Sequence, residues 1–213
     1  MEPTIFSQFE CLRAHVESTM ARPSVVMVTS AKPRDGKSLT AYGLTERLAD
    51  SGRRVVLVEY REGDDMYPPR HSDIATRRAF PIVTLPLDRD GSTVASPALR
   101  DSVDDLRAKY EYAIVDAAPM LKSRLAILLA GIVDGILVTV RLGRTSDADD
   151  AALVATLQRV DASVLGVVAA APKDVDAFAG SSDSHHQNDY IAPMLPASAL
   201  EHTRFPAFEA RPR

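Results

Sequence analysis

The sequence predicts an α/β domain of three layers, with a doubly wound, mainly parallel sheet and helices on both faces. Short apolar runs rich in valine, isoleucine and leucine alternate with segments whose apolar residues recur every three or four positions. The segments between most of these runs are long enough for the crossover helices that parallel strands require. The predicted strands cover residues 25–28, 55–59, 80–87, 112–116, 135–140 and 164–168.

The first periodic segment places Phe6, Phe9, Leu12 and Val16 on one helical face. This spacing predicts an amino-terminal helix over 5–20, and we expect Cys11, the one cysteine, to be buried in it. Further helices are predicted over 38–50, 97–109, 122–133 and 146–160.

Composition limits the class of protein. The 213 residues carry a formal net charge of −4, so no overall basic field favours a nucleic-acid partner. The amino terminus lacks the basic and apolar regions of a signal peptide, and the longest apolar stretch, 125–133, is about half of what a membrane helix needs. We therefore expect a cytoplasmic chain without direct membrane insertion.

A phosphate-binding loop is predicted between the first buried strand and the helix that follows it. Gly36 allows close backbone approach to a phosphate, Lys37 can reach the β- and γ-phosphates, and the Ser38 hydroxyl can hold Mg²⁺. The helix adds unpaired N–H groups and the positive end of its dipole. Ala31 replaces the first glycine of the usual pattern. We expect the nucleotide to contact Lys32, Pro33, Arg34, Asp35, Gly36, Lys37, Ser38 and Leu39.

This loop predicts a P-loop NTPase type of sheet and divides the chain into two parts. We expect a nucleotide-binding domain over 1–171 and a polar, proline-rich, disordered tail over 172–213. The charged segment 60–79, which shows no periodicity, is predicted to be a mobile loop.

Two predicted strands end in an acid, Glu59 and Asp116, at the edge where open parallel sheets bind ligands. We expect Asp116 and Ser38 to hold the metal, with Glu59 meeting it through water or acting as a base. Lys37, Asp116, Glu59 and Lys32 are the predicted catalytic set, since Lys32 can turn toward phosphate or toward a neighbouring subunit. The alternatives are an N-cap for Asp116, a solvated strand end for Glu59 and a solvated loop lysine for Lys32.

The order of these motifs resembles the cytoplasmic P-loop domain of bacterial tyrosine kinases (BY-kinases), within the MinD/ParA group of ATPases. The segment 29–38, Thr-Ser-Ala-Lys-Pro-Arg-Asp-Gly-Lys-Ser, is similar to the first Walker motif of that family. The segment 54–59 resembles its additional acidic motif, and 110–119 resembles Walker B. The segments 133–141 and 164–168 resemble its closing strands.

The resemblance implies ATP and Mg²⁺ as cofactors and phosphoryl transfer to tyrosine, with Tyr190 as the candidate acceptor. It further implies a role in exopolysaccharide or capsule synthesis and export. The implied partner is a membrane-anchored polysaccharide chain-length (co-polymerase) protein, which would bring the chain to the inner membrane. A homo-oligomer is also expected.

Departures from the family pattern keep two other functions open. Arg61 stands where the family carries a second aspartate, Ala170 replaces an asparagine that reads adenine, and the tail offers only Tyr190. These differences favour a weak kinase or a degenerate pseudo-kinase that acts as a scaffold. Lys32 occupies the place of the signature lysine of MinD/ParA proteins, which favours an ATPase that positions cargo by dimerisation.

Overall fold

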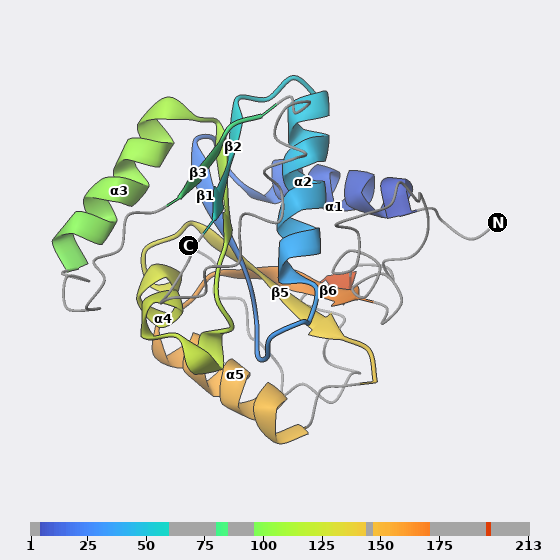
Figure 1. Ribbon diagram of the computed structural model, residues 1–213, viewed down its shortest axis with the longest axis vertical. Coiled ribbons are helices and arrows are strands. Elements are labelled where there is room, and N and C mark those ends of the chain that lie inside the picture. Colours follow the sequence, from blue (N-terminus) through green and yellow to red (C-terminus); the bar gives the residue numbers. More distant parts are fainter. Residues whose placement is uncertain (1–4, 60–79, 85–95, 144–146, 171–194, 197–213) are drawn as a thin grey trace.

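The computed structural model describes residues 5–59, 80–84, 96–143, 147–170 and 195–196, which form one sheet between two layers of helices (Figure 1). The sheet order is β3-β2-β4-β1-β5-β6-β7. The strands are β1 (Ser24–Ser30), β2 (Val55–Glu59), β3 (Ile82–Thr84), β4 (Tyr112–Asp116), β5 (Gly135–Arg141), β6 (Val164–Ala170) and β7 (Leu195–Pro196). The helices are α1 (Ile5–Thr19), α2 (Lys37–Asp50), α3 (Ser96–Lys109), the 3-10 turn η2 (Met120–Lys122), α4 (Arg124–Ala130) and α5 (Asp147–Arg159).

The first six strands pair in parallel, and β7 pairs antiparallel to β6. Every residue of β1 is buried, as expected for a central strand covered on both faces. The predicted three-layer, mainly parallel α/β fold is therefore confirmed.

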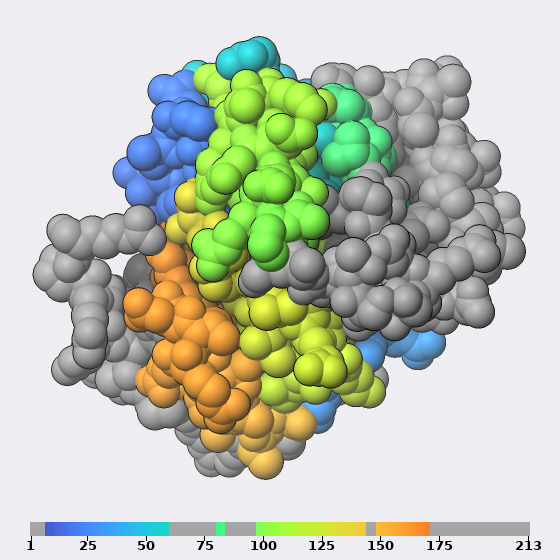
Figure 2. All heavy atoms as spheres, turned by 90° about the vertical axis from the view of Figure 1, so that its left-hand side faces the viewer, coloured from blue at the N-terminus to red at the C-terminus, as the bar shows by residue number. Residues whose placement is uncertain are grey.

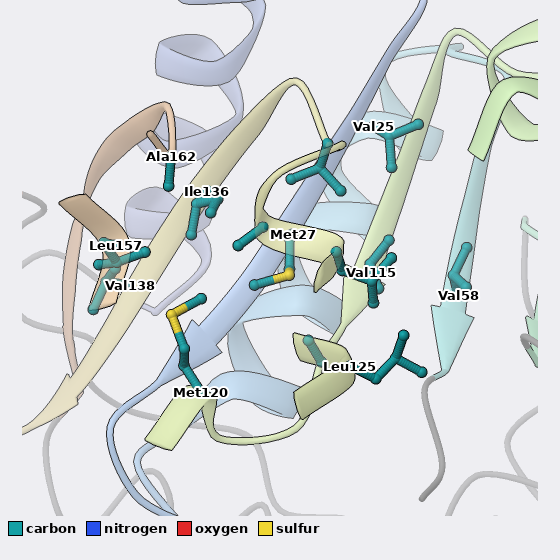
Figure 3. Packing of buried hydrophobic residues seen from close by; sticks show 14 of the residues in the cluster. Val25, Met27, Val58, Val115, Met120, Leu125, Ile136, Val138, Leu157 and Ala162 are labelled. Atoms are coloured by element: carbon teal, nitrogen blue, oxygen red, sulfur yellow. The ribbon is translucent and has the colours of Figure 1, made fainter. Parts of the chain in front are cut away.

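One apolar core lies between the sheet and helices α3, α4 and α5, which cover the same face of the molecule (Figure 2). Met27 of β1 lies at its centre, and Met120 of η2 packs under the carboxyl end of the sheet (Figure 3). Both methionine side chains are fully buried. The flexible thioether chains fill the irregular space where the short turn η2 meets the strands.

The second core lies between the sheet and helices α1 and α2. Phe9, Leu12 and Val16 form the buried face of α1, as their spacing predicts. The ring of Phe9 lies on Gly43 of α2 so closely that a Cβ atom there would be 2.3 Å from the ring. Cys11 is exposed, so the expectation of a buried cysteine was wrong, because position 11 lies off the apolar stripe.

The helix predicted over 122–133 is wrong in its limits. Residues Met120–Lys122 form a separate 3-10 turn, and the extended backbone of Ser123 interrupts the helical path. The Ser123 hydroxyl accepts a hydrogen bond from the Ala126 N–H at 3.1 Å, so α4 begins only at Arg124. It ends at Ala130, where the Gly131 N–H closes a tight turn onto the Leu128 carbonyl.

The remaining predicted helices and strands are present, with their ends shifted by at most two residues except at 80–87. There β3 covers Ile82–Thr84, and residues 85–87 lie outside the described part. The predicted loop over 60–79 also lies outside it, as does the predicted tail apart from β7. None of the helices described is both long enough and apolar enough to cross a membrane.

Ion pairs hold together the amino-terminal edge of the sheet. Asp134 accepts hydrogen bonds from the Val25 N–H at 2.7 Å and from the Arg107 guanidinium at 3.0 and 3.1 Å. Burial alone would lower the Arg107 pKa, but the hydrogen bond and charge of Asp134 outweigh it and raise that pKa. Glu111 accepts from the Arg54 N–H at 2.9 Å and from Arg22, which lowers the pKa of its carboxyl.

Candidate functional site

The predicted phosphate loop leaves β1 at the carboxyl-terminal edge of the sheet and leads into α2 (Figure 1). Gly36 is in the left-handed region, with φ at 92°, and its carbonyl accepts the Thr40 N–H at 2.9 Å. The N–H groups of the first α2 turn have no earlier carbonyl within the helix to bond, so they are free to face an anion. The Leu39 side chain is buried in the core, which leaves only its backbone for a ligand.

Internal hydrogen bonds shape the loop itself. The buried carboxylate of Asp35 accepts a hydrogen bond from the Lys32 N–H at 3.1 Å. The Ser30 hydroxyl donates to the Lys32 carbonyl at 2.5 Å. Arg34, which lies between Lys32 and Asp35 in the chain, has a φ of 66°, the left-handed conformation that glycine adopts more readily. These internal hydrogen bonds therefore support the curved form of the loop.

Lys37 and Asp116 form the charged centre of the site. Burial lowers the pKa of Lys37, and the carboxylates of Asp116 and Asp35 act in the opposite direction. Burial also raises the pKa of Asp116, whereas the Ser38 hydroxyl and the charge of Lys37 lower it. Both groups are partly removed from water, so each favours its neutral form more than usual, and their mutual attraction offsets this only in part.

Glu59 lies beside Asp116, because the two residues are register partners on the neighbouring strands β2 and β4. Register partners on parallel strands point to the same face, here the face covered by α2. The charge of Glu59 adds to the rise in the Asp116 pKa. The structure thus brings together the three predicted metal residues, Ser38, Asp116 and Glu59.

These residues fit Mg²⁺ bound together with a nucleotide. Mg²⁺ prefers oxygen ligands and is commonly held by a hydroxyl or one or two carboxylates together with substrate phosphates. Ser38 and Asp116 supply a hydroxyl and a carboxylate, and they lie close enough for the Ser38 hydroxyl to lower the pKa of Asp116. In the described ranges there is no group of three or more histidine, cysteine, aspartate or glutamate side chains placed to hold a metal ion.

Two buried threonines, which the sequence analysis did not select, fix the strands around the site. The Thr29 hydroxyl donates to the Ala118 carbonyl at 2.9 Å, and the Thr139 hydroxyl donates to the Thr29 carbonyl at 3.2 Å. The Ala117 N–H donates to the Val28 carbonyl at 3.1 Å. The signal that could have identified these two threonines is a hydroxyl residue within an otherwise apolar strand.

The structure separates Lys32 from the other predicted catalytic residues. Its ammonium group forms an ion pair with Asp149 in the first turn of α5, on the opposite face of the sheet from α2. The outer side of the loop borders a hollow of about 630 Å³. This hollow, called the outer hollow below, is lined by Ala31, Lys32, Pro33, Arg34, Leu121, Lys122 and Asp149. Tyr190, the predicted acceptor, lies outside the described residues.

Sequence comparison identifies two bacterial relatives, although no family model matches the chain. The succinoglycan biosynthesis transport protein ExoP of Rhizobium meliloti is 26% identical over 173 residues, which are 68% of this chain and 22% of ExoP. The tyrosine-protein kinase YwqD of Bacillus subtilis is 23% identical over 189 residues, which are 76% of this chain and 78% of YwqD. The chain therefore corresponds to most of YwqD but to less than a quarter of ExoP.

Solved structures show the same fold. The kinase domain of the Escherichia coli tyrosine kinase ETK superposes with a TM-score of 0.64 at 16% identity, over 87% of this chain and 80% of that one. The chain therefore has the fold of bacterial tyrosine kinase domains and of MinD ATPases, at low sequence identity to both. The cell division ATPase MinD of Pyrococcus furiosus superposes with a TM-score of 0.51 at 17% identity, over 68% of this chain and 70% of that one. This fold brings the loop and the two acidic strand ends to one edge of the sheet.

Proposed function

We propose that this domain binds Mg-ATP and transfers its terminal phosphoryl group to tyrosine, as a divergent bacterial tyrosine kinase. The observation that supports this most is the grouping of Ser38 of the loop, Asp116 of β4 and the buried Lys37, in which Ser38 and Lys37 both lower the pKa of Asp116 against its burial. A hydroxyl, a carboxylate and an ammonium group at the amino end of α2 are the groups that phosphoryl transfer requires.

In this proposal the backbone N–H groups of α2 and the Lys37 ammonium bind the β- and γ-phosphates. Ser38 and Asp116 would hold Mg²⁺, which would supply positive charge to neutralise the phosphates. Glu59 is placed beside Asp116 to take up the proton of the acceptor hydroxyl or to contact the metal through water. The low solvent exposure of Lys37 strengthens its interaction with a phosphate, because fewer water molecules screen it.

We further propose that the chain acts in exopolysaccharide or capsule production. Its relatives include a succinoglycan biosynthesis transport protein and a tyrosine-protein kinase. The partner would be a membrane-anchored co-polymerase that controls polysaccharide chain length, and Tyr190 would be a phosphate acceptor. Contact with that partner would bring the cytoplasmic chain to the inner membrane.

The test combines calorimetry of Mg-ATP binding with transfer of radiolabelled phosphate. The variants are Lys37→Ala and, as a control, Lys109→Ala, which removes an exposed lysine at the far end of α3. We expect binding and transfer in the wild type and the control, and neither in Lys37→Ala. Loss of the label in Tyr190→Phe would identify the acceptor. Tight Mg-ATP binding without transfer or phosphate release would contradict the kinase and support the scaffold function.

A MinD-like positioning ATPase is the second candidate. Lys32 supports it, because its side chain extends to α5 on the outer side of the loop rather than joining Ser38 and Asp116. If this function is correct, Lys32→Ala abolishes ATP-dependent dimerisation while ATP binding persists. Sedimentation of the wild type and of Lys32→Ala with and without ATP distinguishes the two candidates.

A further inference from the structure

The outer hollow is bordered by the first half of the phosphate loop, because Lys32, Pro33 and Arg34 of the expected nucleotide contacts line it. Its lining contains none of Gly36, Lys37, Ser38 and Asp116. Instead it joins the outer side of the loop to η2 and to the start of α5, on the opposite face of the sheet from α2. Its volume of about 630 Å³ is within the range of sites that bind a ligand of several residues or a small molecule.

Among the described residues, the lining of the outer hollow is predominantly positive. Three basic side chains, Lys32, Arg34 and Lys122, stand against one carboxylate, Asp149. Asp149 forms an ion pair with Lys32, so the described lining holds no further carboxylate to match the charges of Arg34 and Lys122. Among the described residues, neither of these two side chains has an ion pair or a side-chain hydrogen bond. Both residues are exposed to solvent.

The backbone of Arg34 gives a second, independent indication. Its φ of 66° places an arginine in the left-handed region, at a cost of about 1 kcal/mol relative to glycine. No described ion pair or side-chain hydrogen bond of Arg34 offsets this cost within the chain. The left-handed backbone belongs to the curve of the loop, but the sequence keeps an arginine there where glycine would be less strained, so its charge beside the hollow supports a role in binding a ligand.

We propose that the outer hollow docks an acidic peptide segment of a partner protein, with carboxylates of that segment on Arg34 and Lys122. A guanidinium group binds a carboxylate through two parallel hydrogen bonds, and the lysine adds a second positive point charge at η2. A segment held here lies next to the phosphate loop. This inference depends on the proposed function only where it makes the segment a kinase substrate, because docking requires no nucleotide.

The test measures fluorescence anisotropy of two labelled peptides without nucleotide. One peptide is Glu-Glu-Glu-Tyr-Glu-Glu, and the matched control is Gln-Gln-Gln-Tyr-Gln-Gln. We expect the wild type to prefer the acidic peptide, and the preference to shrink as salt rises. Arg34→Gln and Lys122→Gln should each weaken acidic-peptide binding about threefold, and the double variant about tenfold, because exposed ion pairs are individually weak. Lys109→Gln, on α3, is the control and should bind as the wild type does.

Arg34→Gly separates a loss of charge from a loss of folding. Glycine adopts the left-handed conformation without strain, so this variant should be at least as stable as the wild type and still bind the acidic peptide more weakly. Equal affinity for the two peptides, or unchanged affinity in the double variant, would overturn the proposal. Competition of Mg-ATP with the peptide would also overturn it, since the hollow would then belong to the nucleotide.

The docking site and the proposed function can fail separately. Calorimetry of Mg-ATP binding on the same Arg34 and Lys122 variants tests the nucleotide site without the peptide. Peptide binding without ATP binding would reject the kinase and retain the docking site. ATP binding and transfer with no preference for the acidic peptide would do the reverse.

Discussion

Ionisable groups at the two edges of the sheet have pKa values shifted in opposite senses, toward the charged forms at one edge and toward the neutral forms at the other. At the amino-terminal edge, partners within the chain stabilise the charged forms, so the pKa of Arg107 is raised and that of Glu111 is lowered. At the carboxyl-terminal edge, burial shifts the pKa values of Lys37 and Asp116 toward the neutral forms. The same strands connect both edges, so the difference lies in the loops and not in the architecture.

This difference separates groups that hold the fold from groups that serve a ligand. A carboxylate that receives several hydrogen bonds from its own chain contributes to stability, and its removal leaves the partners unsatisfied. A buried ammonium group with incomplete compensation reduces stability until an anion arrives. Variants at the two edges should therefore affect either stability or ligand affinity, but not both.

The largest expected effect is on nucleotide affinity in Lys37→Met. The unbranched side chain fills similar space without the charge, so Mg-ATP affinity should fall at least about 100-fold, or ~2.7 kcal/mol. The free energy of unfolding should be unchanged or higher, because a desolvated ammonium group is removed. Calorimetry and urea denaturation measure the two quantities. A clear loss of stability would contradict the contrast between the edges.

Asp134→Ala should produce the opposite result at the amino-terminal edge. The Val25 N–H and the Arg107 guanidinium lose their acceptor, and we expect a loss of about 2 kcal/mol in the free energy of unfolding. The estimate is moderate because both side chains of the ion pair are partly exposed. Asp134→Asn keeps an acceptor oxygen and should lose less. Mg-ATP affinity should remain unchanged in both variants, and a fall in it would show that the edges are coupled.

Gly43→Ala tests how tightly α1 is held on α2. The added Cβ would lie 2.3 Å from the Phe9 ring, so the ring must move, and overpacking of this kind costs about 1–3 kcal/mol. The better helix propensity of alanine offsets at most about 1 kcal/mol. The double variant with Phe9→Leu should recover part of the loss in urea denaturation. A Gly43→Ala protein more stable than the wild type would mean that Phe9 has room to turn away.

The smallest expected effect is a shift in the pH dependence of Mg-ATP binding. Metal binding requires ionised Asp116, whose raised pKa should make affinity fall with decreasing pH sooner than an ordinary aspartate would. Glu59→Gln removes a charge that contributes to this rise, so the acidic midpoint should move to lower pH in calorimetric titrations. Stability from Glu111, whose pKa is lowered, should be complete above the ordinary glutamate pKa and should be lost progressively as the pH falls from there through the depressed pKa. An acidic midpoint that stays in place in Glu59→Gln would show that the two carboxylates do not interact.

Much of the fold follows from local sequence pattern. The limits of β2 and β4 agree with the predicted 55–59 and 112–116, because buried parallel strands are continuous apolar runs bounded by polar residues. The break between η2 and α4 was missed, since an apolar segment does not reveal that Ser123 leaves the helical path. Cys11 was misplaced because a single residue type was weighed above the period of the helix.

The site was predictable only in part, for a physical reason. The proximity of Ser38, Asp116 and Glu59 follows from strand polarity, because all parallel strands end at one edge. The ion pair between Lys32 and Asp149 joins residues far apart in the chain and depends on the sheet order, which places β5 next to β1. The order of the strands in the sheet does not follow from the local patterns of a single sequence. The metal and catalytic roles of the site residues remain predictions.

The threonine hydroxyls at the carboxyl-terminal edge have a consequence for amide hydrogen exchange. Thr29 bonds the segment after β4, and Thr139 of β5 bonds Thr29, so three neighbouring strands share buried hydrogen bonds beyond the backbone ladder. The Ala117 amide is bonded to β1 and exchanges only when this unit opens. The amides of these strand ends should therefore share one opening free energy of exchange, and a bound nucleotide should raise it for all of them together.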